Sequence, residues 1–164
     1  MMRFYSKTWE QISQWGTRPS QSVEQRRTVM LTNRISLLIS AFTLILCILS
    51  FSAFGWIYTT QSAFGFTLLF LFPLLLNRLG YNSIARILLS LIISVASIVV
   101  SVVDKFDYYQ LEEFQYFEFR LTLLTATLVP FYIFKLAEVR YWSVALAFNF
   151  LCIVFSILYI VGLA

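Results

Sequence analysis

The chain has 164 residues, of which 60% are hydrophobic and only 12% are charged, and its net charge is +4. Its mean hydropathy is +0.80. A soluble domain needs a polar exterior, so this composition excludes a soluble globular protein and predicts an integral membrane protein. The chain has no histidine, and its two cysteines, Cys47 and Cys152, lie inside apolar runs. This spacing fits neither a disulfide framework nor a zinc site, so we expect no metal and no cofactor.

Residues 1–34 form a polar, basic segment that precedes the first apolar run. Aromatic and apolar residues recur in it at helical spacing, with cations beside them, which favours an amphipathic helix at the membrane interface. A cytoplasmic helix packed on protein is an equal alternative. Gly16 and Pro19 are expected to end this helix. The residues that carry the pattern are Arg3, Tyr5, Lys7, Trp9, Ile12 and Trp15.

The rest of the chain, residues 35–164, is predicted to be the transmembrane domain. Ser22 and Gln25 form a capping pair for a second helix, which we expect to enter the membrane without a break. Residues 59–62 are expected to form a tight, uncharged turn. The predicted fold is an all-α polytopic transmembrane helix bundle of about five spans with an N-terminal interfacial helix. The spans are 35–58, 62–77, 84–103, 119–134 and 141–163.

Two of these spans are short. Residues 62–77 and 119–134 fall below the roughly twenty residues that an untilted span requires. We therefore expect both to borrow flanking residues or to thin the bilayer locally.

The distribution of cations predicts the topology. Ten cations fall on one side of the five spans and two, Lys105 and Arg120, on the other. Cytoplasmic loops carry the excess of lysine and arginine, so the N-terminus is predicted to be cytoplasmic in a multi-pass protein of the inner (cytoplasmic) membrane. Five spans then place the C-terminus outside the cytoplasm. The ten cations are Arg3, Lys7, Arg18, Arg26, Arg27, Arg34, Arg78, Arg86, Lys135 and Arg140.

The predicted extracytoplasmic segment is acidic and aromatic, and it is our candidate ligand or signal loop. Carboxylates supply hard oxygen ligands and aromatic faces attract organic cations. The alternative is an aromatic belt at the membrane interface with solvated charges. The candidate residues are Asp107, Tyr108, Tyr109, Glu112, Glu113, Tyr116, Glu118 and Arg120.

Small and polar residues follow three of the spans in alternating steps of four and three. Lipid gives helices no hydrophobic reason to associate, whereas small residues let backbones approach and hydroxyls bond across the interface. We therefore predict helix-packing seams; a polar permeation path is the alternative. The seam residues are Ser36, Ser40, Thr43 and Cys47 in the first span, Ser90, Ser94, Ser97 and Ser101 in the third, and Asn149, Cys152 and Ser156 in the fifth.

The sequence offers little for catalysis. It contains no histidine, no glycine-rich phosphate loop and no paired carboxylates at membrane depth, so we expect no enzyme activity from this chain alone and no nucleic acid partner. Glu138, in the turn before the last span, is either solvated or in contact with Arg78 or with a cytoplasmic partner.

Several stretches form a pattern that resembles a known architecture. They are residues 32–38 at the first membrane entry, residues 77–81 after a proline-containing span, and Phe119-Arg120 leading to Pro130. This pattern resembles the N-terminal multi-span membrane sensor module of bacterial sensor histidine kinases and class III adenylate or guanylate cyclases. Such modules have an even number of spans, so the resemblance implies either a portion of a longer receptor or a free-standing protein with the same architecture.

The resemblance implies a sensory or regulatory membrane module that relays an extracytoplasmic or bilayer stimulus to a kinase or cyclase output not present in this chain. The expected partners are the lipid bilayer, a second copy of the chain and a cytoplasmic signalling domain. The alternatives are a small transporter or channel subunit and a structural subunit of a membrane complex.

Overall fold

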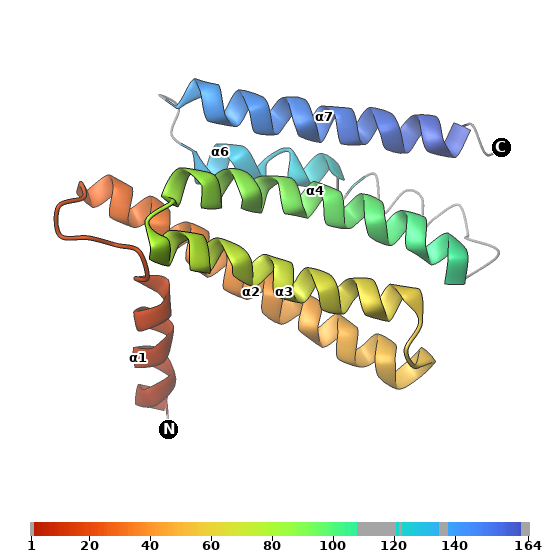
Figure 1. Cartoon of the computed structure of the whole chain (residues 1–164), viewed down its shortest axis with the longest axis horizontal. Helices are drawn as coiled ribbons and strands as arrows, with labels where there is room; N and C mark the ends of the chain where they lie inside the picture. The colour runs from red at the N-terminus through yellow and green to blue at the C-terminus, as the bar shows by residue number, and fades with distance from the viewer. Residues whose placement is uncertain (1, 108–120, 122, 135–137, 162–164) are drawn as a thin grey trace.

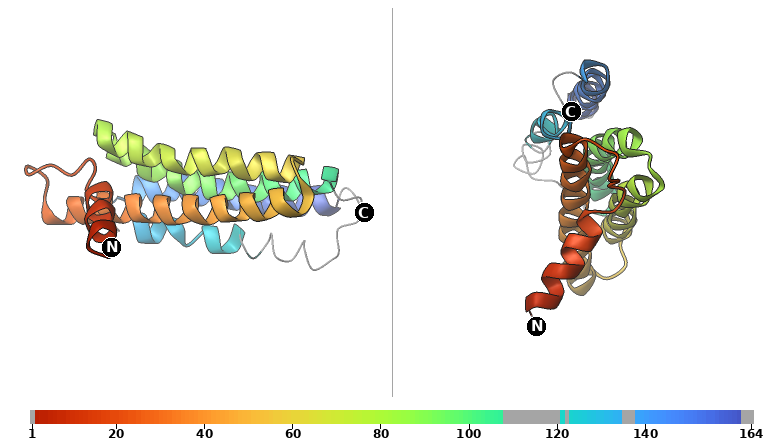
Figure 2. Two further views of the ribbon diagram at one scale, coloured as in Figure 1. Left: turned by 90° about the horizontal axis from the view of Figure 1, so that it is seen from below. Right: turned by 90° about the vertical axis from the view of Figure 1, so that its left-hand side faces the viewer.

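The computed structural model describes residues 2–107, 121, 123–134 and 138–161, and the elements in these residues are helices (Figure 1). Four long helices run side by side, and α1 lies across their common direction at one end. Figure 2 shows the same crossing from two further directions. The helices are α1 (Met2–Ser13), α2 (Val23–Phe54), α3 (Tyr58–Leu79), α4 (Asn82–Asp107), α6 (Val129–Ile133) and α7 (Val139–Val161).

Helix α2 begins as the sequence predicts. The Ser22 hydroxyl accepts a hydrogen bond from the Gln25 backbone N–H at 3.2 Å, and the Gln25 side chain accepts one from the Ser22 backbone N–H at 3.1 Å. These two bonds satisfy donors that a helix start leaves unpaired. The helix then continues without a break for 32 residues, through the predicted membrane entry, so the expectation of a continuous helix is confirmed.

The turn between α2 and α3 lies earlier than predicted. Helix α2 ends at Phe54, Gly55 follows with a φ of 77°, and α3 begins at Tyr58. Residues 59–62 are therefore helical, and their assignment as a turn was wrong. Glycine adopts a positive φ without steric cost, so the chain turns at Gly55. The polar residues 59–62 that come after the turn are part of α3. There the Ser62 hydroxyl donates to the Tyr58 carbonyl at 2.6 Å.

Helix α3 is longer than the predicted second span. It has 22 residues because its first turn includes the polar residues that the sequence analysis assigned to a turn. It ends at Gly80, which has a φ of 94° in the left-handed region, while the Tyr81 N–H bonds to the Leu76 carbonyl at 2.9 Å. Such a glycine cap lets the chain reverse tightly into α4. Helix α3 therefore includes the flanking residues that the short predicted span was expected to borrow, and at 22 residues it is long enough to cross a bilayer without local thinning.

The surface of the long helices is largely apolar, whereas many polar side chains are buried between them. Many large apolar side chains on α2 are more than half exposed, among them Leu38, Phe42 and Ile45, whereas Ser36, Thr32 and Asn33 on the same helix are fully buried. Water does not tolerate so much contiguous apolar surface, and lipid does. A smaller apolar core joins α3, α4, α6 and α7; its buried members are Phe66, Phe70, Leu89, Ile92, Ile133, Phe134 and Ala145.

The chain is a membrane protein with three helices that are long and apolar enough to cross a bilayer. These helices are Val23–Phe54, Tyr58–Leu79 and Asn82–Val100. Two further apolar helices, Leu123–Ile133 and Val139–Phe155, are shorter in the described part of the chain.

Helices α2, α3 and α4 pack on one another in chain order, and α7 packs beside α4. Helix α2 packs most extensively on α3, and α3 packs on α4. Helix α7 contacts α4 and α6, and α6 also contacts α2 and α4. The start of α2, the turn from α3 to α4 and the start of α7 lie at the same end as α1 (Figure 1). The α6–α7 pair is thus joined to the other helices mainly through α4.

Candidate functional site

The first polar cluster, which we call the clasp, holds the end of α1 against the bundle. Asn33 lies two residues before the apolar part of α2 and is fully buried. Its Nδ2 donates to the Ser13 carbonyl at 3.0 Å and to the Trp15 carbonyl at 2.9 Å. The last carbonyls of a helix lack hydrogen-bond donors within the helix, and here the Asn33 amide donates to the carbonyls at the end of α1 and just after it. The clasp consists of Ser13, Trp15, Gly16, Asn33 and Asn77.

Helix α3 completes the clasp. Nδ2 of Asn77, also fully buried, donates to the Asn33 Oδ1 at 2.7 Å. Gly16 has a φ of 81°, and a Cβ added to it would lie 2.0 Å from the Asn77 backbone oxygen. Only glycine therefore fits where the chain leaving α1 touches α3.

Two arginines border the clasp. The Arg34 Nε donates to the Ser13 hydroxyl at 3.4 Å, and the Arg78 guanidinium lies 5.2 Å from the centre of the Trp15 ring. A cation over an indole face adds electrostatic attraction to the apolar contact. Helices α1, α2 and α3 are thereby fixed to one another at the cation-rich end of the molecule.

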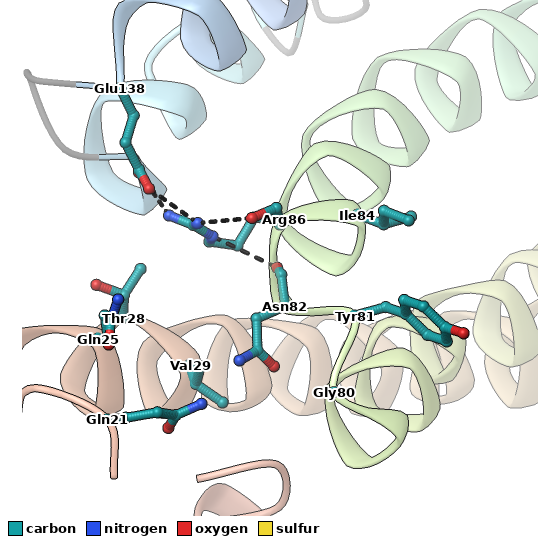
Figure 3. Close-up of a pocket in the computed structure, with 11 residues that line it drawn as sticks. Gln21, Gln25, Thr28, Val29, Gly80, Tyr81, Asn82, Ile84, Arg86 and Glu138 are labelled. Carbon is teal, nitrogen blue, oxygen red and sulfur yellow. Dashed lines mark hydrogen bonds and ion pairs between the residues drawn. The ribbon is translucent and has the colours of Figure 1, made fainter. Parts of the chain in front are cut away.

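A cavity of about 520 Å³ lies beside the clasp (Figure 3). The start of α2 forms one wall, the α3–α4 turn forms another, and Glu138 enters from the α7 side. The Asn82 Oδ1 is buried there without a hydrogen-bond partner in the described part of the chain. A water molecule or a polar ligand with an N–H or O–H group would satisfy this oxygen. The lining residues are Gln21, Gln25, Thr28, Val29, Gly80, Tyr81, Asn82, Ser83, Ile84, Arg86 and Glu138.

An ion pair crosses the edge of this cavity. The Arg86 Nη1 lies 2.6 Å from the Glu138 Oε2, and the Arg86 Nη2 lies 3.0 Å from the Glu138 Oε1. Arg86 is only 7% exposed, and its guanidinium also lies 5.2 Å from the centre of the Phe134 ring. Glu138 therefore pairs with Arg86, a contact that none of the sequence-based alternatives included. Two-point contacts of this kind hold a carboxylate in a defined orientation.

The seam residues of α2 face α3. The hydroxyl of Ser36 donates to the Phe70 carbonyl, and the hydroxyl of Ser40 donates to the Thr67 carbonyl at 3.0 Å. The Cys47 thiol lies 3.7 Å from the Thr60 carbonyl. The Thr43 hydroxyl donates within its own helix, to the Ser40 carbonyl at 3.0 Å, and accepts from the Thr67 hydroxyl of α3 at 3.1 Å. The α2 seam is consequently filled by α3.

The seam residues of α4 and α7 meet each other at one point. The Ser94 hydroxyl donates to the Asn149 Oδ1 at 2.7 Å, and the Asn149 Nδ2 donates to the Ala126 carbonyl at 3.1 Å. Ser90 and Ser97 are buried but bond to their own helix. Cys152 is buried on α7. The side chains of Ser101 and Ser156 lie outside the described part of the chain.

The candidate ligand loop cannot be placed in this site. Asp107 is the last residue of α4, and its side chain is outside the described part. The remaining members, Tyr108, Tyr109, Glu112, Glu113, Tyr116, Glu118 and Arg120, also lie outside the described residues.

Sequence reasoning missed the clasp and the ion pair. Asn33 and Asn77 entered only as parts of membrane-entry and turn patterns, and Arg86 only as one cation in a topology count. The sequence did contain a signal, because Asn33 lies just before the first apolar run and Asn77 just after the second. A polar side chain buried at such a position costs free energy unless it has a hydrogen-bond partner. The identity of the partners depends on helix packing, which the pattern does not contain.

The described residues include no group of three or more His, Cys, Asp or Glu side chains that could hold a metal ion. Instead, the site joins four helices through amides, carbonyls and one ion pair at the edge of a cavity. No protein-family model, curated protein or solved structure matches this chain.

Proposed function

We propose that this chain is a membrane-embedded sensory or regulatory module in which the α6–α7 pair shifts against α2, α3 and α4. A cytoplasmic signalling partner of the kinase or cyclase class would read the shift. The observation that carries the proposal is how the α6–α7 pair is attached. Among the described residues, the side-chain polar contacts between this pair and α4 are Arg86–Glu138 beside the cavity and Ser94–Asn149 within the bundle. A pair of helices that is held by few polar contacts beside a cavity is suited to switch between two packing arrangements.

The proposal includes a five-span topology with a cytoplasmic N-terminus in an inner membrane. It is supported by the arginines with described side chains, all of which lie at the same end of the molecule as α1: before α2, in the part of α2 that precedes Ile35, at the end of α3, or near the starts of α4 and α7. A cytoplasmic location of this end would satisfy the excess of cations on that side of the membrane. These arginines are Arg18, Arg26, Arg27, Arg34, Arg78, Arg86 and Arg140.

The proposal also includes α1 as an interfacial helix. The clasp attaches α1 at Asn33, directly before the apolar part of α2, and α1 crosses the direction of the long helices (Figure 1). A helix held at that height and in that direction would lie in the plane of the headgroups, where indole rings such as that of Trp9 are favourable.

A channel or transporter receives less support. The hydroxyls of Ser36 and Ser40 are used in bonds to α3, and those of Ser90 and Ser97 are used within α4. A permeation path needs polar groups that remain available to the solute along its length. The seams therefore favour helix packing.

Distance measurements by electron spin resonance test the proposal. In a background with Cys47→Ala and Cys152→Ala, spin labels at Ile84→Cys and Val144→Cys report the separation of α4 and α7; both positions are more than half exposed. In nanodiscs we expect two distance populations, whose ratio changes when Glu138→Gln removes one charge of the ion pair. A single distance that is identical with and without Glu138→Gln would contradict the two-state proposal.

A further inference from the structure

The first twelve residues of α2 precede its apolar run and expose a basic face. Helix α2 begins at Val23 and its apolar run begins at Ile35, so this stretch rises about 18 Å at about 1.5 Å per residue. Residues 23, 26, 27, 30, 31 and 34 are spaced by threes and fours and share one side of the helix. The buried residues Val29, Thr32 and Ser36 lie on the opposite side.

This basic face surrounds a hollow of about 510 Å³. Three arginines and three apolar residues line it: Val23, Arg26, Arg27, Met30, Leu31 and Arg34. Arg26 and Arg27 are exposed, and Val23 is 81% exposed. Among the described residues, no acidic side chain lines the hollow, in contrast to the neighbouring cavity, where Glu138 neutralises Arg86.

We infer that this hollow binds the headgroup of an anionic phospholipid. The bilayer is the one partner that three membrane-crossing helices require, and Arg34 lies directly before the apolar run that enters it. Guanidinium groups hold phosphate oxygens by paired hydrogen bonds. Arg27 is far enough from the hydrocarbon to reach the outer headgroup layer, while Leu31 and Met30 contact the glycerol end of the lipid.

The site is connected to the clasp through one side chain. The Arg34 Nε bonds to the Ser13 hydroxyl at 3.4 Å, which is a long contact, so a phosphate competes for the same guanidinium. The charge of the leaflet thereby influences how firmly α1 is held. Lipid binding at this hollow is independent of the proposed signalling, because it requires only the bilayer and α2.

Native mass spectrometry of the purified full-length chain tests the inference. The chain, in detergent micelles, is titrated with phosphatidylglycerol and, separately, with phosphatidylcholine. We expect phosphatidylglycerol to be retained preferentially and Arg27→Gln to weaken its binding about fivefold, which corresponds to about 1 kcal/mol per arginine near an anionic surface. Arg27 is the most direct probe because it makes no hydrogen bond or ion pair within the described part of the chain.

Arg140→Gln is the matched control, since it removes one exposed charge from the same end of the molecule but from α7. It should leave phosphatidylglycerol binding unchanged. Equal retention of the two lipids overturns the inference, as does a loss in Arg27→Gln no greater than that in Arg140→Gln. Arg27-dependent binding of a poly-glutamate peptide without selective lipid retention also overturns it, and would assign the hollow to an acidic protein segment.

Discussion

At the scale of single residues, the clasp depends on side chains whose size and hydrogen-bonding capacity are narrowly defined. Asn33 and Asn77 are fully buried amides in a membrane protein, and each donates to an oxygen of a neighbouring segment. A buried amide without partners is costly, so these bonds determine where the end of α1 can lie. Gly16 permits the approach because it has no Cβ.

Gly16→Ala is predicted to open the clasp. Alanine would need a φ near 81°, and its Cβ would meet the Asn77 backbone oxygen at 2.0 Å. Strain of this kind costs about 2 kcal/mol, which raises the open population about thirtyfold. Cleavage by chymotrypsin after Trp15, followed by mass spectrometry, should accelerate accordingly.

Gly65→Ala provides the matched control for this substitution. Gly65 lies within α3, and no atom lies within 4 Å of an added Cβ. Alanine is the better helix former, so cleavage after Trp15 should be unchanged and α3 slightly more stable. Equal cleavage rates in both variants would show that Gly16 does not control the docking of α1.

At the scale of helices, the joint between α4 and α7 is a small polar contact in an apolar surrounding. Asn149 accepts from Ser94 and donates to the Ala126 carbonyl, so one side chain links α4, α7 and the segment before α6. Ser94 can return to its own helix when Asn149 is removed, as Ser90 and Ser97 already do. The Ala126 carbonyl has less freedom, so the two partners are not equivalent.

Asn149→Ala should therefore destabilise the protein more than Ser94→Ala. Hydrogen bonds between membrane helices contribute about 0.6 kcal/mol on average and about 1.7 kcal/mol at most. A double-mutant cycle followed by unfolding in sodium dodecyl sulfate measures the coupling, which we expect in this range. Ser143→Ala, at an exposed position of α7, is the control and should have no effect. Additive single effects would mean that the Ser94–Asn149 bond does not contribute.

At the scale of the whole molecule, α2, α3 and α4 form one packed group, to which α1 attaches at one end, while α7 runs beside α4 (Figure 1). The clasp attaches α1, and the Arg86–Glu138 pair links α4 to the residue before α7. The cavity of about 520 Å³ lies between them. The clasp and the Arg86–Glu138 pair therefore lie near each other, at the same end of the molecule.

Removing Glu138 should destabilise the protein more than removing Arg86. Glu138→Ala leaves the charge of Arg86, whose side chain is 9% exposed, without its carboxylate. Arg86→Met leaves a carboxylate on a side chain that is 26% exposed and can be hydrated. Breaking a buried pair costs about 3 kcal/mol when the remaining charge stays buried. The thermal midpoint in detergent should fall clearly in Glu138→Ala and less in Arg86→Met; the reverse order would contradict this description of the pair.

Much of the helical framework follows from local sequence. The capping pair of Ser22 and Gln25, the continuous α2 and the helical periodicity of residues 5–12 are local patterns, and each appears in the structure. The turn at Gly55 was misplaced because its neighbours Trp56 and Ile57 are apolar, so hydropathy alone continued the span. The outer-loop candidates lie outside the described residues, and their role stays a prediction.

The sequence by itself determined that the chain is helical, belongs in a membrane and concentrates its cations near one set of helix ends. Hydropathy, capping and charge are properties of residues close together along the chain. Only the tertiary structure decided which groups become partners. Asn33 meets the carbonyl of Ser13, 20 residues away, and Arg86 meets Glu138, 52 residues away. The crossing and rotation of packed helices select such contacts, because a buried polar group must bond to whichever group the packing brings within reach.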